Sequence, residues 1–320
     1  MRPLSICVLG GTGFVGSQLC ARLARAGHRL SVLTRHAERG KHLRVLPSLR
    51  LVQADVHDPA GLAAAFRDQD AVVNLVGILN ESGRNGAGFR RAHVELARKV
   101  IAACRGARVD RLLHMSSLNA DADQGPSHYL RSKGEAERIV RDEGGPDLQW
   151  TIFQPSVIFG SGDSFINRFA SLLAAVPLAL PLARPGVRLA PVWVDDVSAA
   201  MHAALDDPAT AGECYQLCGP DVLTLREIVG WVRDELGLQR SIIGLPDFAA
   251  RLQAAVMDFV PGKPFSSDNF RSLSQDSVCT ENGFARLGIR PGSMKSIVPD
   301  YLTANRGGCR YDRFRREARR

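Results

Sequence analysis

Tyr129 and Lys133 are the residues of this sequence best suited, by type and spacing, to carry out chemistry. Residues four apart on a helix share one face, so the phenol and the ammonium group would lie together. Tyrosine has a pKa of about 10 in water, and a neighbouring ammonium group stabilises the phenolate and lowers that pKa. Ser116 and Ser117 end the apolar run before this helix, and Ser117 is the better candidate to hold a substrate oxygen. The pattern predicts proton transfer to or from oxygen.

The alternative is that Tyr129 and Lys133 lie on a solvated helix face, because such pairs are frequent by chance. A glycine-rich turn, Gly10–Gly16, favours the catalytic interpretation, since it joins a strand-like run at 4–9 to a helix-like segment at 17–27. Glycines there allow a tight turn and a close approach to a pyrophosphate, which the amides at the helix start would bind. A turn without a ligand is disfavoured by this context. The predicted cofactor-binding residues are Gly10, Thr12, Gly13, Phe14, Val15 and Gly16.

The end of the second strand-like segment, 28–34, predicts which nucleotide binds. An acid there would bind the ribose 2′-hydroxyl of NAD, whereas a cation suits the 2′-phosphate of NADP. This chain has Arg35, so NADPH is expected in preference to NADH, with a solvated basic loop as the alternative. Asp55, after the third strand, could accept a hydrogen bond from the adenine amino group. Further cofactor contacts are expected from Val56, Asn74, Val76 and Gly77.

Strand-like and helix-like segments alternate along the first half of the chain. Strands are expected at 4–9, 28–34, 51–54, 71–77 and 112–117, and helices at 17–27, 59–67, 88–105 and 127–137. This alternation predicts an α/β fold with a Rossmann-type, doubly wound parallel sheet. We expect three parts: a nucleotide-binding domain over 1–160 that 190–220 rejoin, a smaller, mostly helical substrate domain over 161–189 and 221–304, and a disordered tail over 305–320.

The second half of the chain carries weaker signals. Apolar residues at 176–181 would line a pocket for a lipid-like substrate or form ordinary core. An apolar-sided helix at 246–260 could cover the substrate. Asp195 and Asp196 are expected to cap a helix at 197–205. A second helix is expected at 224–236, with Thr224 and Glu227 forming a capping box.

Charge and composition exclude some partners. The net charge is +8, but residues 306–320 hold seven Arg against two acids, so the body is near neutral. This argues against binding of nucleic acid. The tail could touch anionic lipid headgroups, and a solvated tail is the alternative. No metal site is expected, because Cys214 and Cys218 lack zinc-ligand spacing.

The chain is expected in a bacterial cytoplasm, at most peripheral at the inner face of the membrane. No signal peptide is visible before the first strand, and the longest apolar run, 169–183, is broken by Pro177 and Pro181. The seven cysteines are scattered and odd in number, which favours reduced thiols.

Taken together, these motifs resemble the short-chain dehydrogenase/reductase superfamily, in its extended and atypical branches. The matching segments are Gly10–Gly16, Asp55-Val56, Asn74–Gly77, Ser116-Ser117, Tyr129-x-x-x-Lys133, Pro155–Gly160 and Val192–Val197. The resemblance implies that Tyr129, Lys133 and Ser117 are catalytic and that Lys133 also holds the nicotinamide ribose. It places Pro155 and Val157 in a proline turn beside the nicotinamide.

Within the superfamily, the sequence is most similar to bacterial relatives of the NADPH-binding accessory subunit of respiratory complex I. Segments carrying this likeness are Thr34-Arg35, Asn74–Gly77, His93–Arg98, Tyr129–Lys133, Ser267–Asn269 and Leu287–Ile289. The resemblance implies NADPH as the cofactor. It also implies links to complex I, to ubiquinone biosynthesis or to other oxidoreductase roles, with a structural nucleotide in the complex I subunit.

Three functions therefore remain open. The first is an oxidoreductase that moves hydride between NADPH and a carbonyl or hydroxyl of an apolar, quinone-related substrate. The second is a non-catalytic NADPH-binding accessory or assembly protein of a respiratory or ubiquinone-biosynthesis complex. The third, a nucleotide-sugar epimerase or dehydratase, ranks last, because it needs a polar, Arg-lined pocket and residues 169–182 are mostly apolar.

Overall fold

A computed structural model describes residues 2–261 and 263–302, and the tail expected at 305–320 lies outside them. The chain divides into two compact units. Unit 1 comprises the residues up to Pro155 together with Val194–Leu217 and Cys279–Arg290. Unit 2 comprises Ser156–Trp193, Cys218–Val278 and the residues from Pro291. Residues 279–290 thus join unit 1, although they fall within the segment assigned from the sequence to the smaller domain.

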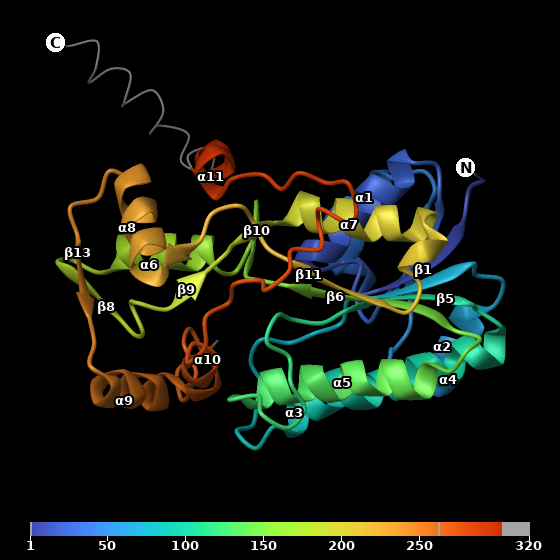
Figure 1. Ribbon diagram of the computed structural model, residues 1–320, viewed down its shortest axis with the longest axis horizontal. Coiled ribbons are helices and arrows are strands. Elements are labelled where there is room, and N and C mark those ends of the chain that lie inside the picture. Colours follow the sequence, from blue (N-terminus) through green and yellow to red (C-terminus); the bar gives the residue numbers. More distant parts are fainter. Residues whose placement is uncertain (1, 262, 303–320) are drawn as a thin grey trace, which may run out of the picture. The chain divides into compact units, whose positions relative to one another are not determined.

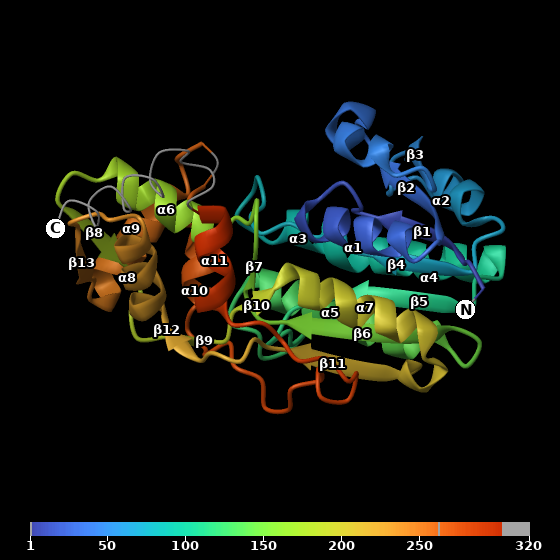
Figure 2. The ribbon, with the colours of Figure 1, turned by 90° about the horizontal axis from the view of Figure 1, so that it is seen from above.

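Unit 1 is built on a parallel sheet of seven strands, which confirms the Rossmann-type parallel sheet expected from the sequence. Its strands are β1 (Ser5–Leu9), β2 (Arg29–Thr34), β3 (Leu49–Gln53), β4 (Ala71–Asn74), β5 (Arg111–Met115), β6 (Gln149–Pro155) and β11 (Glu213–Leu217). Figure 2 shows their order across the sheet, β11-β6-β5-β4-β1-β2-β3. Because all seven run the same way, the segments that follow β1, β4 and β5 leave one edge of the sheet together.

Helices cover both faces of this sheet (Figure 1). On one face lie α1 (Phe14–Arg25) and α7 (Val194–Asp206), and on the other lie α2 (Pro59–Phe66), α4 (Leu96–Ala107) and α5 (His128–Gly144). The connections include η1 (Ala37–Val45), α3 (Ala87–Phe89), η2 (Arg90–Glu95) and η3 (Pro208–Thr210). The helix expected at 88–105 is therefore α3, η2 and α4 in succession, and η2 is a π-helix.

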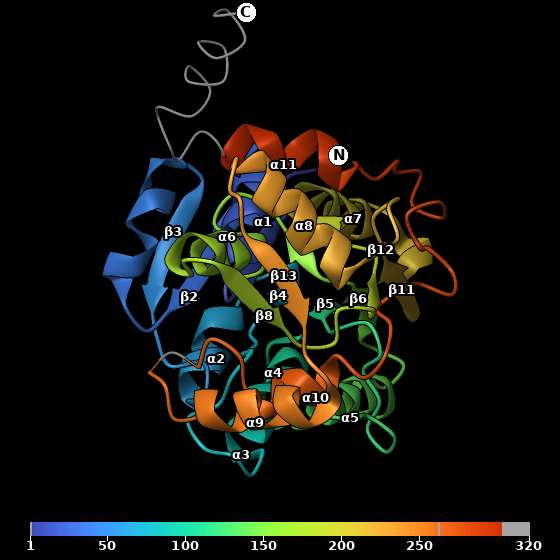
Figure 3. The ribbon, with the colours of Figure 1, turned by 90° about the vertical axis from the view of Figure 1, so that its left-hand side faces the viewer.

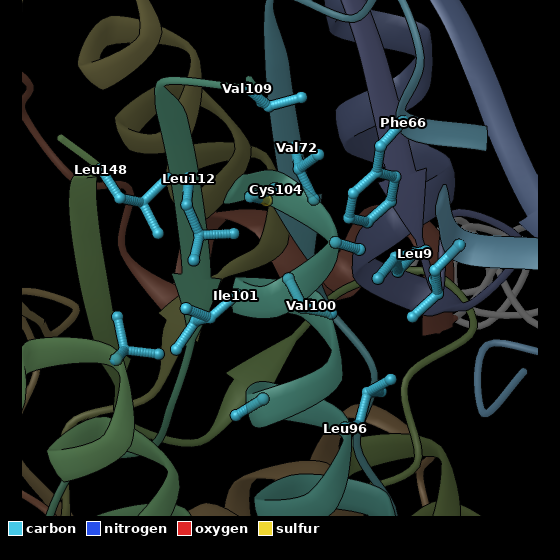
Figure 4. Packing of buried hydrophobic residues seen from close by; sticks show 14 of the residues in the cluster. Leu9, Phe66, Val72, Leu96, Val100, Ile101, Cys104, Val109, Leu112 and Leu148 are labelled. Atoms are coloured by element: carbon cyan, nitrogen blue, oxygen red, sulfur yellow. The ribbon is translucent and has the colours of Figure 1, made fainter. Parts of the chain in front are cut away.

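One buried apolar cluster of unit 1 lies between the sheet and helices α2, α4 and α5 (Figure 4). Leu9, Val72 and Leu112 project from neighbouring strands, and Phe66 and Ile101 meet them from the helices. These strands are apolar on both faces because helices cover both sides of the sheet.

Unit 2 consists of helices and short strand pairs. The helices are α6 (Ile166–Ala175), α8 (Leu225–Glu235), α9 (Asp247–Met257), α10 (Ser267–Ser272) and α11 (Met294–Leu302). The strands pair as β7 (Ile158–Phe159) with β10 (Val192–Trp193), β8 (Ala179–Leu182) with β13 (Ser241–Gly244), and β9 (Arg188–Leu189) with β12 (Leu223–Thr224). Figure 3 shows β8 beside β13. The capping box of Thr224 and Glu227 at the start of α8 is confirmed.

Several local expectations are wrong. Asp195 and Asp196 lie inside the first turn of α7, which begins at Val194, so they do not precede the helix as caps. Asp195 instead accepts a hydrogen bond of 2.8 Å from Arg22 on α1. Cys218 and Cys279 are disulfide-bonded, whereas Cys7, Cys20, Cys104 and Cys214 are free thiols. The spacing of cysteines along the chain does not reveal such bonds.

The apolar side of α9 is exposed. The exposed fractions of Phe248, Leu252 and Val256 are 76%, 65% and 58%, and Phe259, just after the helix, is 75% exposed. Ala250 and Ala254 occupy the buried side instead. The idea that this apolar side covers a substrate therefore gains no support from its packing. Among the described residues, no helix is both long and apolar enough to cross a membrane.

Candidate functional site

The glycine-rich turn adopts a backbone that only its glycines allow. Gly10, directly after β1, has φ of +78°, and a Cβ there would lie 3.1 Å from the carbonyl carbon of Leu75. A Cβ on Gly16 would collide with the carbonyl oxygen of Gly10. The turn is thus packed between the exit of β4 and the first turn of α1.

The start of α1 fits a pyrophosphate. Gly13 is its N-cap residue and is exposed, and no side chain caps the first turn. A Cβ on Gly13 would be 3.2 Å from the Gly10 oxygen, so a side chain here would fill the approach to the helix. Backbone N–H groups and the positive end of the helix dipole suit an anion at this position. The flanking residues Thr12, Phe14 and Val15 are half-buried.

The ends of β2 and β3 bring Arg35 and Asp55 near each other. Thr34 closes the turn after β2 through hydrogen bonds of 3.1 and 3.3 Å with the backbone of His36. Arg35 and Asp55 are both exposed. The N–H of His57 donates to Asp55 at 3.0 Å and is the main cause of the lowered pKa of that carboxyl, to which Arg35 adds. Val56 turns inward and packs on the core.

The buried side chain of Asn74, the last residue of β4, holds the backbone that follows this strand. Its Oδ1 accepts the N–H of Val76 at 3.2 Å, and its Nδ2 lies 3.3 Å from Nδ1 of His114. Burial, with a further contribution from Lys133, lowers the pKa of His114 to about 3, so this imidazole is neutral. The buried amide of Asn74 is thus engaged within the protein, and Gly77 is the exposed residue of this exit.

Ser117, Tyr129 and Lys133 meet at the carboxyl edge of the sheet. A side-chain hydrogen bond joins Ser117, just after β5, to Tyr129 in the first turn of α5. Burial raises the pKa of the Tyr129 phenol, and the hydrogen bond to Ser117 opposes that rise. The expectation that Lys133 lowers this pKa is not met, because the Lys133 ammonium donates to the carbonyl of Met115 at 3.0 Å.

Lys133 is buried and reaches toward the exit of β4. A Cβ on Gly77 would lie 3.2 Å from its Nζ, so this glycine leaves room for the ammonium group. Burial lowers the pKa of Lys133 to about 8, and the buried Glu137 one turn later opposes that shift. Burial raises the pKa of Glu137, although its carboxylate accepts hydrogen bonds from Gln154 at 2.9 Å and Arg141 at 3.0 Å.

His93 belongs to this site, and the sequence did not assign it a role. It lies on the π-helix η2, and its ring centroid is 5.7 Å from that of Tyr129 in an edge-to-face arrangement. Nε2 accepts the N–H of Ile78 at 3.2 Å, and Nδ1 lies 2.8 Å from Oγ of Ser132, which donates to the Tyr129 carbonyl. The proton is therefore on Nδ1. Burial lowers the pKa of His93 to about 2, with Lys133 contributing.

The proline turn divides between the two units. Pro155 ends β6 in unit 1, and its carbonyl accepts the N–H of Leu118 at 2.9 Å, which fixes the strand next to Ser117. Val157 belongs to unit 2, where its carbonyl accepts the N–H of Val192 at 3.0 Å and its side chain packs on the core of that unit.

One group of potential metal ligands lies elsewhere in unit 1. The ligand atoms of His28, His202 and Asp206 are within 4.8 Å of one another. The N–H of Leu4 donates to Nδ1 of His28 at 3.1 Å, which in the neutral ring leaves the proton on Nε2. A protonated nitrogen cannot bind a metal, so we assign this group no ion.

Comparison with known proteins agrees with this architecture. Residues 10–164 match a family described as NAD(P)H-binding. The fold and the glycine-rich turn define an NAD(P)H-binding protein of the short-chain dehydrogenase/reductase type. More particularly, the chain belongs to the family of NADH dehydrogenase [ubiquinone] 1 alpha subcomplex subunit 9.

Two relatives carry that assignment. The mitochondrial subunit 9 of Arabidopsis thaliana is 30% identical over 94% of this chain and 78% of its own length. The subunit of Mus musculus is 32% identical over 91% of this chain and 78% of its own length. An enzyme is also similar, the (4-alkanoyl-5-oxo-2,5-dihydrofuran-3-yl)methyl phosphate reductase of Streptomyces griseus, with 29% identity over 72% of this chain and 74% of the enzyme.

Solved structures share the fold. Pal from Bacillus thuringiensis superposes with a TM-score of 0.77 at 15% identity, covering 94% of this chain and 99% of Pal. The double mutant of the dTDP-glucose 4,6-dehydratase DesIV from Streptomyces venezuelae, with NAD bound, gives 0.73 at 22% identity, covering 96% and 97%. The α/β architecture expected from the sequence is thus confirmed, and the two subunit 9 relatives confirm the family resemblance.

Proposed function

We propose that this protein is an NADPH-dependent reductase of a carbonyl group on an apolar substrate. The observation that carries the proposal is the hydrogen bond between Ser117 and Tyr129, with Lys133 one helical turn away. A hydroxyl, a phenol and an ammonium group at the carboxyl edge of the sheet are the groups that such a reaction needs.

The protonation state of Tyr129 favours reduction of a carbonyl over oxidation of a hydroxyl. Burial raises the pKa of Tyr129, so the phenol keeps its proton at neutral pH and can donate it to a carbonyl oxygen. Ser117 would orient that oxygen. Lys133, held by the Met115 carbonyl, would bind the nicotinamide ribose. NADPH, when bound, supplies the hydride.

The cofactor would lie along the edge formed by the glycine-rich turn and the exit of β4. Its pyrophosphate fits the uncapped start of α1 at Gly13. Arg35 is the reason to prefer NADPH, because an exposed guanidinium at the end of β2 suits a 2′-phosphate. We assign Asp55 to the adenine, and Val56, Asn74, Val76, Pro155 and Val157 to contacts along the remaining length.

We propose an apolar substrate, related to a quinone, because an open and mostly apolar hollow lies on the surface of unit 2. This hollow of about 580 Å³ lies on α6. Its lining is mostly small and aliphatic: Ala170, Ala174, Ala175, Leu236 and Leu302, with Asn167 and Ser171. We propose that 161–189 and 221–304 serve as the substrate domain.

A second candidate function is that of a non-catalytic NADPH-binding subunit or assembly factor of a respiratory or ubiquinone-biosynthesis complex. It is favoured by the relatives named as complex I subunits, which match nearly the whole chain. In either role we place the protein in the bacterial cytoplasm, with the Arg-rich tail at 306–320 as a candidate for weak contact with the inner face of the membrane.

The test combines binding with turnover. NADPH and NADH are titrated into the purified protein by nicotinamide fluorescence, and quinones and small carbonyl compounds are then added. Oxidation of NADPH by an acceptor supports the reductase. Tight binding of NADPH without turnover favours the subunit, and absence of binding contradicts both.

A further inference from the structure

A row of polar side chains runs along α5 from the candidate proton donor toward the surface. Four residues come at intervals of four, so each side chain neighbours the next on the helix: Tyr129, Lys133, Glu137 and Arg141. The exposed fractions of Lys133 and Glu137 are 4% and 3%, whereas 44% of the Arg141 side chain is exposed. The helix thus places a buried carboxyl group one turn after the buried ammonium group.

The contacts of Glu137 favour its ionised form. Oε1 and Oε2 each lie 2.9 Å from Nε2 of Gln154 on β6, and Oε2 also accepts from Arg141 at 3.0 Å. Both partners donate, and the guanidinium donor is charged, so these hydrogen bonds stabilise the carboxylate. Burial raises the pKa of Glu137, and the hydrogen bonds and the charges of Arg141 and Lys133 oppose that rise.

The ammonium group of Lys133 depends on such an anion. It can donate three hydrogen bonds, and the carbonyl of Met115 accepts one of them at 3.0 Å. Burial of an ammonium group favours the neutral amine, and it lowers the pKa of Lys133 to about 8. Within the described chain, Glu137 is the charged group that opposes this shift. Without Glu137, the amine would lose its proton at a still lower pH.

The other titratable groups that face Lys133 are neutral near pH 7. His93 lies on η2 and His114 on β5, and burial lowers the pKa of these imidazoles to about 2 and about 3. On α5 itself, burial raises the pKa of Tyr129, so the phenol keeps its proton. Lys133 is therefore the group of this cluster that changes its charge just above neutral pH.

The surroundings of Glu137 add no second titration in this range. Cys214 of β11 accepts a hydrogen bond from Arg141, and burial raises the pKa of this thiol. Helix α4 contributes Arg98, which pairs with Glu143 near the end of α5 at 3.2 Å. That pair is exposed, so Glu143 offers a matched carboxylate on the same helix for comparison.

We propose that Glu137 is a positioning residue that keeps Lys133 charged, so that the ammonium group can hold the nicotinamide ribose of NADPH. The inference rests on the proposed function and adds to it a residue that touches neither substrate nor cofactor. Glu137 would act through Lys133, and Gln154 and Arg141 would keep the carboxylate ionised. Loss of this negative charge should leave Lys133 as a neutral amine in the pH range in which the parent protein binds NADPH.

The first test follows the charge of Lys133 in the full-length protein without nucleotide. The sequence has five lysines, so ¹³C labelling of lysine Cε gives few NMR signals, and Lys133→Met identifies the one from Lys133. Its titration midpoint should lie near pH 8 in the parent protein. In Glu137→Gln the midpoint should fall by at least about one pH unit, and in Glu143→Gln it should stay in place.

The second test measures NADPH binding by nicotinamide fluorescence. Near pH 6 both proteins keep Lys133 charged, so the affinities of Glu137→Gln and the parent should agree within about twofold. Near pH 7.5 the variant should bind at least about threefold more weakly, because most of its Lys133 is then neutral. A purely structural role of Glu137 would weaken binding equally at both pH values.

The outcomes separate this proposal from the proposed function. An unchanged Lys133 midpoint in Glu137→Gln, or a midpoint below about 7 in the parent protein, overturns the role of Glu137. A shifted midpoint without any NADPH binding supports the charge control and contradicts the proposed function. If Glu137→Gln fails to fold, Glu137→Asp decides: it keeps the charge and should keep the midpoint, and a fall of about one unit overturns the proposal.

Discussion

Nδ1 of His93 lies 2.8 Å from the hydroxyl oxygen of Ser132, and this contact ties the π-helix η2 to α5 beside Tyr129. On the other side of the same ring, Nε2 receives the N–H of Ile78. One neutral imidazole therefore connects the exit of β4 to the helix that carries Tyr129 and Lys133.

The first prediction concerns this bridge. His93→Phe keeps an aromatic ring against Tyr129 but leaves Ile78 N–H and Ser132 without their partner, so the free energy of unfolding should fall by about 1–3 kcal/mol. Urea denaturation measures the change. His36→Phe, on the exposed turn after β2, should leave stability unchanged, and equal stability of the two variants would contradict the bridge.

The second prediction concerns the proton donor. Tyr129→Phe removes the only atom of that side chain able to donate a proton, so NADPH oxidation by any acceptor should fall to background while NADPH affinity stays within about twofold. Tyr301→Phe is a control, because Tyr301 donates to Asp163 within unit 2. Turnover in Tyr129→Phe would show that another group is the acid.

The third prediction concerns nucleotide choice. Arg35→Ala should weaken NADPH binding by about tenfold or more, in line with the loss of a charged hydrogen bond, and should hardly change NADH binding. Fluorescence titration of both nucleotides checks this. Arg25→Ala serves as the control for net charge. Equal losses for NADPH and NADH would remove Arg35 from the 2′-phosphate site.

The fourth prediction concerns the buried ammonium group of Lys133. Its pKa is lowered from 10.5 to about 8 in the folded protein, so between these values the unfolded chain binds more protons and stability rises with pH. Lys133→Met should abolish that rise, which is on the order of 3 kcal/mol. Urea titrations at pH 7.5 and 10 would show it, and parallel curves for both proteins would refute it.

Local signals in the sequence predicted much of the fold. Alternation of apolar runs placed β1 to β5, because each strand is short and bounded by turn residues, and Thr224 with Glu227 marked the start of α8. The predicted start of α7 was wrong, because the contact that fixes Asp195 involves a residue far away in the sequence. Asp195 looks like a helix cap in sequence, yet its partner, Arg22, is 173 residues away.

The candidate site was predictable only in part. The spacing of Tyr129 and Lys133 follows from helix geometry, so the sequence shows that they share a face. The hydrogen-bond partner of the Lys133 ammonium group cannot be predicted from that spacing, because it is the backbone carbonyl of Met115 in β5. His93 was missed for a similar reason, since a π-helix changes the spacing on which face assignment depends.

The last strand of the sheet has a consequence for the order of folding during synthesis. β11 pairs with β6 and α7 packs beside α1, yet both are translated only after residue 193. A nascent chain that ends at Pro155 would hold six strands with the β6 edge unpaired and one face partly bare. Such an edge invites aggregation, so chaperones that shield nascent chains should matter most before residue 217 leaves the ribosome.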